Sequence, residues 1–186
     1  MADLKNKVAV VTGASKGIGA AIAQKLGEQG AKVIVNYVHD KGGAEKVVGK
    51  IKQAGGTAVA VQADVSSPQD IKKLFSETTK AFGKVDILVN NAGVYEFRSL
   101  ESVDEEHFRK HFDLNVLGLL LTTKEAVSHM NGEGGSIINV SSVVSKTPPP
   151  GYSVYSATKG AVDVISRALA LELAPKIGRE RLNSSH

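Results

Sequence analysis

The chain has 186 residues, of which 42% are hydrophobic and 23% are charged, and this composition is typical of one globular domain with a buried core. No hydrophobic run reaches the roughly 20 residues that a membrane-spanning helix needs, and the absence of cysteine excludes disulfides and thiolate metal sites. The formal net charge is +4, but basic residues alternate with acids and aromatic residues make up only 5%, so we expect no nucleic-acid binding. The first residues leave no room for a secretory signal, so we expect a cytoplasmic protein.

Short hydrophobic runs alternate with longer amphipathic stretches along the chain. The runs predict strands at residues 7–11, 32–36, 57–62, 86–90 and 136–140. Between them, hydrophobic residues recur at helical spacing. These positions are Ile18, Ile22 and Leu26; Ile71, Leu74, Phe75 and Thr78; Phe108, Phe112, Val116, Leu119 and Leu120; Val162, Ile165, Leu169 and Leu173. Strands alternating with helices predict an α/β fold of the Rossmann type, a doubly wound parallel sheet between two layers of helices.

A glycine-rich turn, Thr12-Gly13-Ala14-Ser15-Lys16-Gly17-Ile18-Gly19, joins the first predicted strand to a helix. Gly13 allows a tight turn, Gly17 lets the backbone approach a pyrophosphate, and Gly19 allows close packing of the helix on the strand. Free backbone N–H groups at the start of such a helix bind anions. Glycines also serve plain turns, but this position in the first βαβ unit predicts a dinucleotide site.

The end of the second predicted strand bears on which nicotinamide cofactor binds. Asn36 is neutral there, whereas an acid would bind the adenosine ribose hydroxyls and favour NAD(H). Lys16, His39 and Lys41 offer positive partners to a 2′-phosphate. We therefore expect NADP(H) to be preferred and NAD(H) to be possible; the alternative for Lys16 is that it simply faces water.

The last predicted helix opens with Tyr155, and Lys159 follows on the same helix face. A free phenol ionises near pH 10, and a neighbouring cation favours the ionised form, so this pair is suited to proton transfer. Ser142 follows the fifth strand at the same end of the sheet, where its hydroxyl can hold a reacting oxygen. The rival phenol, Tyr152, is expected to lie before the helix begins. A tyrosine four residues before a lysine is common on helix surfaces, and the glycine turn is what makes this pair a candidate.

Together these motifs resemble the short-chain dehydrogenase/reductase family. The glycine turn, Asn90-Asn91-Ala92-Gly93, Asn115, Ser142 and Tyr155-x-x-x-Lys159 occur in the family's order from residue 7 to about residue 176. The subgroup of 3-oxoacyl-carrier-protein reductases and glucose 1-dehydrogenases is the most similar. The resemblance implies an NADP(H)-dependent oxidoreductase that interconverts a carbonyl and a secondary alcohol by hydride transfer.

The resemblance also implies catalytic roles. Tyr155 would be the general acid/base, Lys159 would hold the nicotinamide ribose, and Ser142 would polarise the substrate carbonyl. Asn115 would anchor a water that passes protons to Lys159. From the residues alone, Asn115 is equally well explained as a mid-helix amide that binds backbone.

Further cofactor contacts are implied for two loops after predicted strands. Asp64 and Val65 would flank the adenine, and Asn91, Ala92 and Gly93 would line the adenosine side. From the residues alone, Asp64 is equally well a helix N-cap and Asn91 a turn residue.

Two histidines, His107 and His111, are four residues apart on one predicted helix, a spacing that metal sites use. No third ligand is suggested by spacing, so we predict a solvated helix face and no metal site.

Two loops are placed to frame a substrate. Residues 95–98 are expected at the entrance to the substrate site. Residues 148–151, Pro-Pro-Pro-Gly, are expected to stiffen the loop over the substrate, or to be a rigid connector.

The chain departs from the family pattern after residue 177. Residues 178–186 are polar where the family continues with a sixth strand and a substrate-covering segment. We expect a dinucleotide-binding catalytic domain over residues 1–177 and an aberrant polar tail, of frameshifted or vector origin, over residues 178–186. The strand at residues 136–140 would then be an unprotected sheet edge.

The missing segment leaves rivals to a working enzyme. One is a truncated, catalytically impaired nucleotide-binding remnant, and another is a purely structural partner protein. Family members usually form oligomers, so the resemblance implies a homo-oligomer, dimer or tetramer, for the full-length protein.

Overall fold

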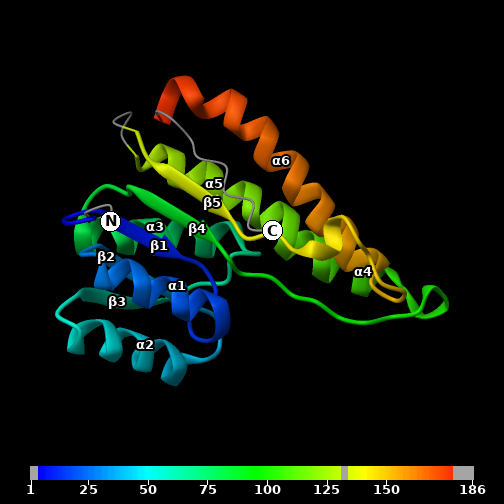
Figure 1. Cartoon of the computed structure of the whole chain (residues 1–186), viewed down its shortest axis with the longest axis horizontal. Helices are drawn as coiled ribbons and strands as arrows, with labels where there is room; N and C mark the ends of the chain where they lie inside the picture. The colour runs from blue at the N-terminus through cyan, green and yellow to red at the C-terminus, as the bar shows by residue number, and fades with distance from the viewer. Residues whose placement is uncertain (1–3, 131–133, 178–186) are drawn as a thin grey trace.

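Five parallel strands form the central sheet of the computed structural model, which describes residues 4–130 and 134–177 (Figure 1). Their order across the sheet is β3-β2-β1-β4-β5. The strands are β1 Val8–Val11, β2 Lys32–Tyr37, β3 Thr57–Gln62, β4 Ile87–Asn90 and β5 Ser136–Asn139. All five predicted strands are confirmed, with ends that differ by one residue at most.

Helices cover both faces of the sheet (Figure 1). They are α1 Gly17–Glu28, α2 Lys41–Gln53, α3 Pro68–Phe82, α4 Glu105–Phe112, α5 Leu119–Ser128 and α6 Ser153–Ile177, with the short helical segments η1 Leu100–Ser102, η2 Asp113–Gly118 and η3 Val143–Ser145. Helices α1 and α2 pack on one face, and α3, α5 and α6 pack on the other. The predicted doubly wound Rossmann-type α/β fold is confirmed.

Strand β1 shows why the sheet needs helices on both sides. Ala9 and Val11 face the cluster that contains α1 and α2, and Val10 faces the cluster that contains α3 and α5. All of β1 is buried, as the continuous hydrophobic run predicts for a strand covered on both faces.

The buried face of α1 differs from the prediction. Small residues form it: Gly19, Ala20, Ala23 and Gly27. Ile22 and Leu26 are partly buried against the core, but Ile18 is exposed. The prediction was therefore wrong for Ile18, because α1 packs closely on its neighbours through small residues rather than through a branched stripe.

The prediction for the helix with two histidines was wrong. His107 and His111 are 2% and 0% exposed, whereas Phe108 is 46% exposed. Their rings pack edge to face at 4.4 Å, and His111 Nδ1 lies 2.8 Å from the carbonyl oxygen of His107. The next segment, η2, is π-helical. A π-helix bonds residue i to i+5, so a hydrophobic spacing that runs across it no longer marks one face.

Strand β5 forms one edge of the sheet within the described residues, and Ile138 on it is half-buried. The predicted polar tail at residues 178–186 lies outside the described residues, so the proposed division of the chain at residue 177 stays a prediction. Within the part of the chain that the structure describes, no helix has the length and hydrophobicity to cross a membrane.

Candidate active site

The glycine turn lies between β1 and α1, at the carboxyl edge of the sheet. Gly13 and Gly17 have φ values of +60° and +58°, which is the left-handed region that favours glycine. A Cβ atom on Gly17 would meet nothing within 4 Å, whereas one on Gly19 would collide with the Asn91 side chain and the Gly13 carbonyl. The turn is therefore tightly packed at Gly19, on the side of Asn91, and it has open space beside Gly17 at the N-terminus of α1. This arrangement fits a pyrophosphate.

Asn36 supports this turn from inside the protein. Its Oδ1 accepts a hydrogen bond from the Gly13 N–H at 3.2 Å. Its Nδ2 donates to the carbonyl oxygens of Val61 at 3.3 Å and Ala63 at 2.9 Å. The side chain is buried and bonded to backbone on β3 and the glycine turn, so its predicted contact with a cofactor stays a prediction.

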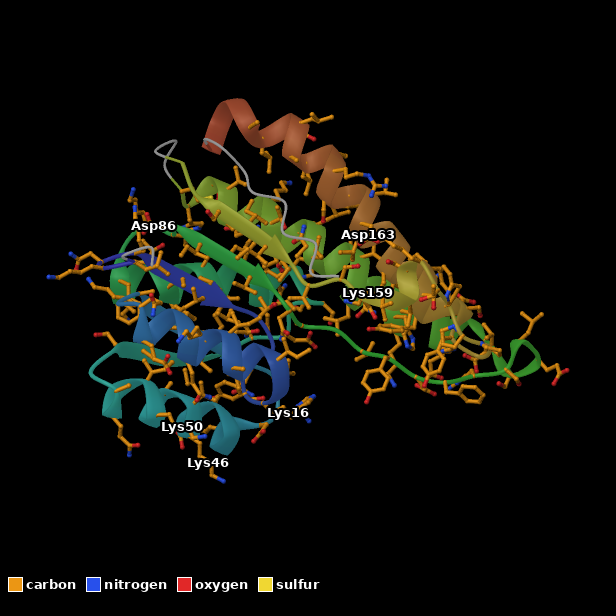
Figure 2. The ribbon with its side chains drawn as sticks, viewed as in Figure 1. Lys16, Lys46, Lys50, Asp86, Lys159 and Asp163 are labelled. Carbon is orange, nitrogen blue, oxygen red and sulfur yellow. The ribbon has the colours of Figure 1, made fainter. Side chains whose placement is uncertain are left out.

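Basic residues lie on the surface near the turn. Lys16 and His39 are exposed, and Lys41 forms an exposed ion pair with Glu45 at 3.6 Å. Asp40 lies among them, but its carboxylate caps helix α2. Figure 2 shows Lys16 at the start of α1, directed away from the protein. Positive charge at this position suits the phosphates of a nucleotide.

The loop after β4 is attached to the glycine turn through Thr12. The Thr12 hydroxyl accepts from the N–H groups of Asn91 and Ala92, each at 3.0 Å. Asn91 Nδ2 donates to the carbonyl oxygens of Thr12 at 2.9 Å and Gly13 at 3.0 Å. The side chain of Asn91 thus positions the turn, and its contact with a cofactor stays a prediction. Thr12 was identified from the sequence as the first residue of the turn, but the role of its hydroxyl was not predicted.

Asp64 and Val65 follow β3. The Asp64 carboxylate accepts from the Ser66 N–H at 2.9 Å and the Ser66 hydroxyl at 2.7 Å, while Ser67 is the N-cap of α3. The alternative that Asp64 caps the helix was therefore wrong, because the cap belongs to a residue three positions later. Val65 is buried, and its carbonyl lies against Gly118.

Lys159 is the centre of the predicted catalytic group. Its ammonium is buried, donates to the Val140 carbonyl at 2.9 Å, and lies 5.9 Å from the centroid of the Tyr155 ring. The phenol and the ammonium therefore project to the same region, as their spacing predicts. Burial lowers the pKa of Lys159, and the carboxylate of Asp163 opposes that shift. Figure 2 shows Lys159 and Asp163 near each other on α6.

Asn115 lies in the π-helical segment η2 and is buried. Its Nδ2 donates to the Val94 carbonyl at 2.9 Å and to Thr158 Oγ1 at 3.0 Å, and its Oδ1 accepts from the Val94 N–H at 2.9 Å. A Cβ atom on Gly93 would lie 3.1 Å from Asn115 Oδ1 and 3.9 Å from Lys159 Nζ. Gly93 thus lies against both side chains. The backbone-bonding alternative accounts for both Val94 bonds, and the water-anchoring role stays a prediction.

Ser142 is half-buried at the N-cap of η3, where its Oγ accepts from the Val144 N–H at 3.4 Å. The residues on either side of it are held by α6. Asp163 accepts side-chain hydrogen bonds from Ser141 and Ser145, which lower the pKa of its carboxyl although burial alone would raise it. Asp163 was not predicted from the sequence. Its position one turn after Lys159 was the available signal.

Aromatic rings surround Tyr155. The Tyr95 ring lies 6.0 Å from the Tyr155 ring and the Tyr152 ring lies 6.4 Å from it, between centroids. Tyr152 directly precedes the first residue of α6, as expected for the rival phenol.

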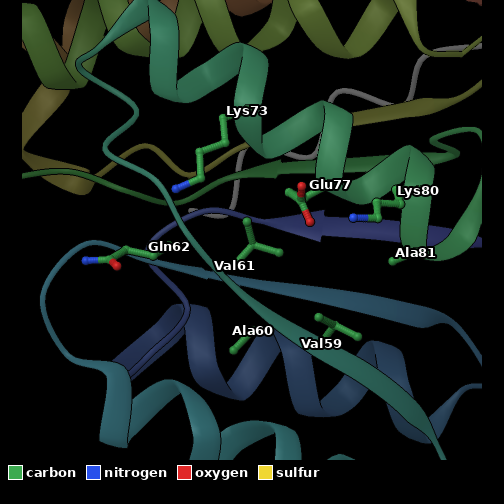
Figure 3. Close-up of a pocket in the computed structure, with 8 residues that line it drawn as sticks. All are labelled: Val59, Ala60, Val61, Gln62, Lys73, Glu77, Lys80 and Ala81. Atoms are coloured by element: carbon green, nitrogen blue, oxygen red, sulfur yellow. The ribbon is translucent and has the colours of Figure 1, made fainter.

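Two surface hollows lie apart from this group. One, of about 410 Å³, lies between β3 and α3 beside Lys73, Glu77 and Lys80 (Figure 3). The other, of about 610 Å³, lies between the loop at residues 148–151 and the start of α6. None of the predicted catalytic or cofactor-binding residues lines either of them, but the second is lined by residues 148–151, the loop expected over the substrate. Within the described residues, no group of three or more histidines, aspartates and glutamates is arranged to hold a metal ion.

The model of the short chain dehydrogenase family matches residues 7–178, and the chain belongs to this family. The resemblance that the motifs indicate is thereby confirmed at the level of the family. Its more specific part, the subgroup of 3-oxoacyl-carrier-protein reductases and glucose 1-dehydrogenases, stays a prediction.

Curated relatives match nearly all of the chain. An uncharacterized oxidoreductase of Methylorubrum extorquens is 57% identical over 176 residues, which are 95% of this chain and 71% of that protein. Versicolorin reductase 1 of Aspergillus parasiticus is 45% identical over 93% of this chain and 66% of its own length. Tetrahydroxynaphthalene reductase of Pyricularia oryzae is 40% identical over 94% of this chain and 62% of its own length. The chain therefore spans about two thirds of these proteins.

Solved structures agree with the fold. A short chain dehydrogenase from Burkholderia cenocepacia in complex with NADP has a TM-score of 0.89 and 36% identity, over 94% of this chain and 71% of that one. A dehydrogenase/reductase from Sinorhizobium meliloti has a TM-score of 0.91 and 40% identity, over 94% and 69% of the two chains.

Proposed function

We propose that residues 1–177 form the cofactor-binding and catalytic part of an NADP(H)-dependent oxidoreductase that interconverts a carbonyl and a secondary alcohol. The observation that carries this proposal is that Asn115 and Lys159 both lie against Gly93, with the Tyr155 ring 5.9 Å from the Lys159 ammonium. The same chain has a glycine turn with open space beside Gly17, as a pyrophosphate needs. A solved relative in complex with NADP and relatives that are named reductases support it.

The residues have separate tasks in this reaction. A bound nicotinamide supplies the hydride in reduction. Tyr155 gives its proton to the carbonyl oxygen, and the hydroxyl of Ser142 donates to the same oxygen and stabilises the charge that develops there. Lys159, held by the Val140 carbonyl, places a positive charge beside the phenol and favours its ionised form. Asn115 anchors a water that returns a proton towards Lys159.

The cofactor is proposed to lie across the carboxyl edge of the sheet. The N–H groups at the start of α1 bind the pyrophosphate, helped by Ser15 and Ile18 of the turn. Asp64 and Val65 flank the adenine, and Lys16 binds a 2′-phosphate, which favours NADP(H) over NAD(H).

A second candidate is a nucleotide-binding remnant without turnover. It is favoured by the position of β5 at the edge of the described sheet, with Ile138 only half-buried. Titration with NADPH and NADH, followed by a turnover assay on a panel of carbonyl compounds, separates the candidates. Binding without turnover supports the remnant, and binding of neither cofactor supports a structural partner protein.

Replacing Tyr155 with Phe tests the proposed chemistry. The variant keeps the ring and loses the proton donor, so turnover should fall at least 100-fold while NADPH affinity stays within about threefold. Tyr152→Phe is the matched control, because it removes the rival hydroxyl one residue before α6. Equal losses in both variants would contradict the assignment to Tyr155.

We also propose that the full-length protein is a homo-oligomer. Val164 and Leu171 on α6 are large hydrophobic side chains left exposed, which is typical of a surface that pairs with another subunit. Sedimentation velocity of the full-length protein and of its Val164→Glu variant tests this, and a full-length protein that is a monomer at every concentration would contradict it.

A further inference from the structure

Aromatic residues are few in this chain and gather around Tyr155. The chain contains five Phe, four Tyr and no Trp. Four of these nine rings form one connected row: Phe97 to Tyr152 at 5.7 Å, Tyr152 to Tyr155 at 6.4 Å, and Tyr155 to Tyr95 at 6.0 Å between centroids. The row therefore starts and ends on the loop after β4, with the predicted proton donor inside it.

The two rings contributed by that loop are open to solvent. Tyr95 is 74% exposed and Phe97 is 60% exposed. Each of them contacts another ring of the row, Tyr95 that of Tyr155 and Phe97 that of Tyr152. Large exposed rings beside a reactive group indicate a surface that a ligand covers. We refer to Tyr95 and Phe97 as the ring platform.

The backbone of the ring platform is fixed by charges on its other side. Glu96 and Arg98 alternate with the two rings and pair with each other at 2.9 Å. Glu96 also pairs with Lys110 at 3.1 Å, and Arg98 with Asp104 at 2.9 Å. These bonds tie the loop to α4 and its N-cap, so the backbone that carries the two rings is held in place before any ligand arrives.

A glycine gives the Phe97 ring its position. Gly151 has a φ of +78°, and a Cβ atom there would overlap the Phe97 ring. The Gly151 carbonyl accepts from the Arg98 N–H at 2.9 Å. The Phe97 ring therefore packs on the backbone of Gly151, where no side chain is present, and the Tyr152 ring contacts it edge to face.

We propose that the ring platform selects aryl carbonyl compounds and the corresponding aryl alcohols, which lie with their flat ring against Tyr95 and Phe97. Aromatic rings prefer offset or edge-to-face partners at 4.5–7 Å. The Tyr95 ring lies 6.0 Å from the Tyr155 ring, so a substrate ring packed on Tyr95 lies next to the ring that carries the proposed proton donor. A saturated ring of equal size gains burial but lacks this geometric preference. The inference rests on the proposed function and names the substrate class of the same site.

Binding of a flat probe tests the platform without needing turnover. We would follow the fluorescence anisotropy of 2-naphthol in the presence of NADP⁺, with decahydro-2-naphthol, its saturated counterpart, as competitor. The whole chain should bind 2-naphthol at least about fivefold more tightly than the saturated compound. Tyr95→Leu combined with Phe97→Leu should weaken 2-naphthol binding roughly fivefold to tenfold and change binding of the saturated compound less than twofold.

Two further variants make the result specific. Tyr95→Phe keeps the ring and should keep 2-naphthol affinity within twofold. Phe108→Leu removes an exposed ring on α4, where it stacks on Phe112, and should have no effect. Equal affinity for the flat and saturated compounds, or equal loss in Phe108→Leu, would overturn the proposal. A change in self-association instead of ligand binding would also overturn it, because the platform would then be an interface between copies.

Turnover separates this proposal from the proposed function. In an assay with 1-tetralone and 1-decalone, the double variant should lower kcat/KM for 1-tetralone selectively. Intrinsic reactivity cancels because each ketone is compared between variants. If the ratio of kcat/KM for the two ketones is the same in the parent chain and in the double variant, only the proposed substrate class is overturned. Failure to bind NADPH, together with no turnover of either ketone, overturns the proposed function itself.

Discussion

Asn115 and Thr158, 43 positions apart, are joined by a hydrogen bond of 3.0 Å from the side-chain amide to the threonine hydroxyl. The same hydroxyl lies 2.7 Å from the Tyr155 carbonyl, to which it donates. It therefore connects the π-helical segment η2 to the first turn of α6. Through this bond the amide next to Gly93 and the helix that carries the phenol and ammonium are placed relative to each other.

Thr158→Val removes this link and keeps the side-chain shape. The buried Asn115 amide loses one partner, so the free energy of unfolding should fall by about 1–3 kcal/mol, as measured by urea denaturation. We also expect kcat to fall more than the affinity for NADPH, because the change affects catalytic geometry and leaves the glycine turn intact.

Thr147→Val is the matched control, since the Thr147 hydroxyl bonds the Val143 carbonyl at 3.2 Å on an exposed loop. This variant should unfold within about 0.5 kcal/mol of the parent chain. An equal loss of unfolding free energy in both variants would show that the Asn115–Thr158 bond stabilises the fold no more than the exposed Thr147 bond does.

The strands and the glycine turn were predictable because their signals are local. A continuous hydrophobic run such as that of β1 can only be buried on both faces, and glycines at Gly13 and Gly17 permit the backbone that the turn adopts. The Tyr155–Lys159 pair was equally accessible, since both residues lie on one helix turn.

Features that depend on contacts across the fold were not predictable. The sequence does not indicate that Asn36 binds the Val61 carbonyl of β3, or that Asp163 forms hydrogen bonds with Ser141 and Ser145. The buried histidines were mispredicted because two polar side chains four residues apart are typical of a solvated helix face, whereas in α4 the two imidazole rings pack on each other inside the fold.

Asp163 should act on the pH dependence of the reaction. Its carboxylate opposes the effect of burial on Lys159, so Asp163→Asn should lower the pKa of Lys159 further. The ammonium would then lose its proton at a lower pH, and the alkaline limb of the kcat/KM profile should move to lower pH. The asparagine oxygen can still accept from Ser141 or Ser145, which limits the structural change.

Glu172→Gln is the control for that measurement, because it removes an exposed acid from the same helix. Its pH profile should match that of the parent chain. An unchanged alkaline limb in Asp163→Asn would show that the carboxylate does not influence Lys159 during catalysis.

Lys16 should discriminate between the two cofactors. If it binds the 2′-phosphate, Lys16→Gln should weaken NADPH binding roughly threefold to tenfold and leave NADH binding within twofold. Lys50→Gln removes the same charge from an exposed position on α2 (Figure 2). Fluorescence titration that finds equal weakening for both cofactors, or the same effect in Lys50→Gln, would contradict this role.

His107 should make the protein sensitive to acid. Burial, then the charges of Arg98 and His111, lower the pKa of His107 below its ordinary value near 6.5. Below that pH the unfolded chain binds the proton more readily than the folded chain. The free energy of unfolding should therefore be highest above about pH 6.5 and should fall as the pH decreases towards the lowered pKa of the folded state.

His107→Leu tests the assignment through urea denaturation between pH 5.5 and pH 8. Both ring nitrogens of His107 are buried without a hydrogen-bond partner among the described residues, so leucine should cost little stability at pH 8. It should also flatten the acid decline, because one buried site no longer has to be protonated. His39→Gln removes an exposed histidine and should leave the decline unchanged. An equally steep decline in the His107→Leu variant would assign the acid sensitivity to other groups.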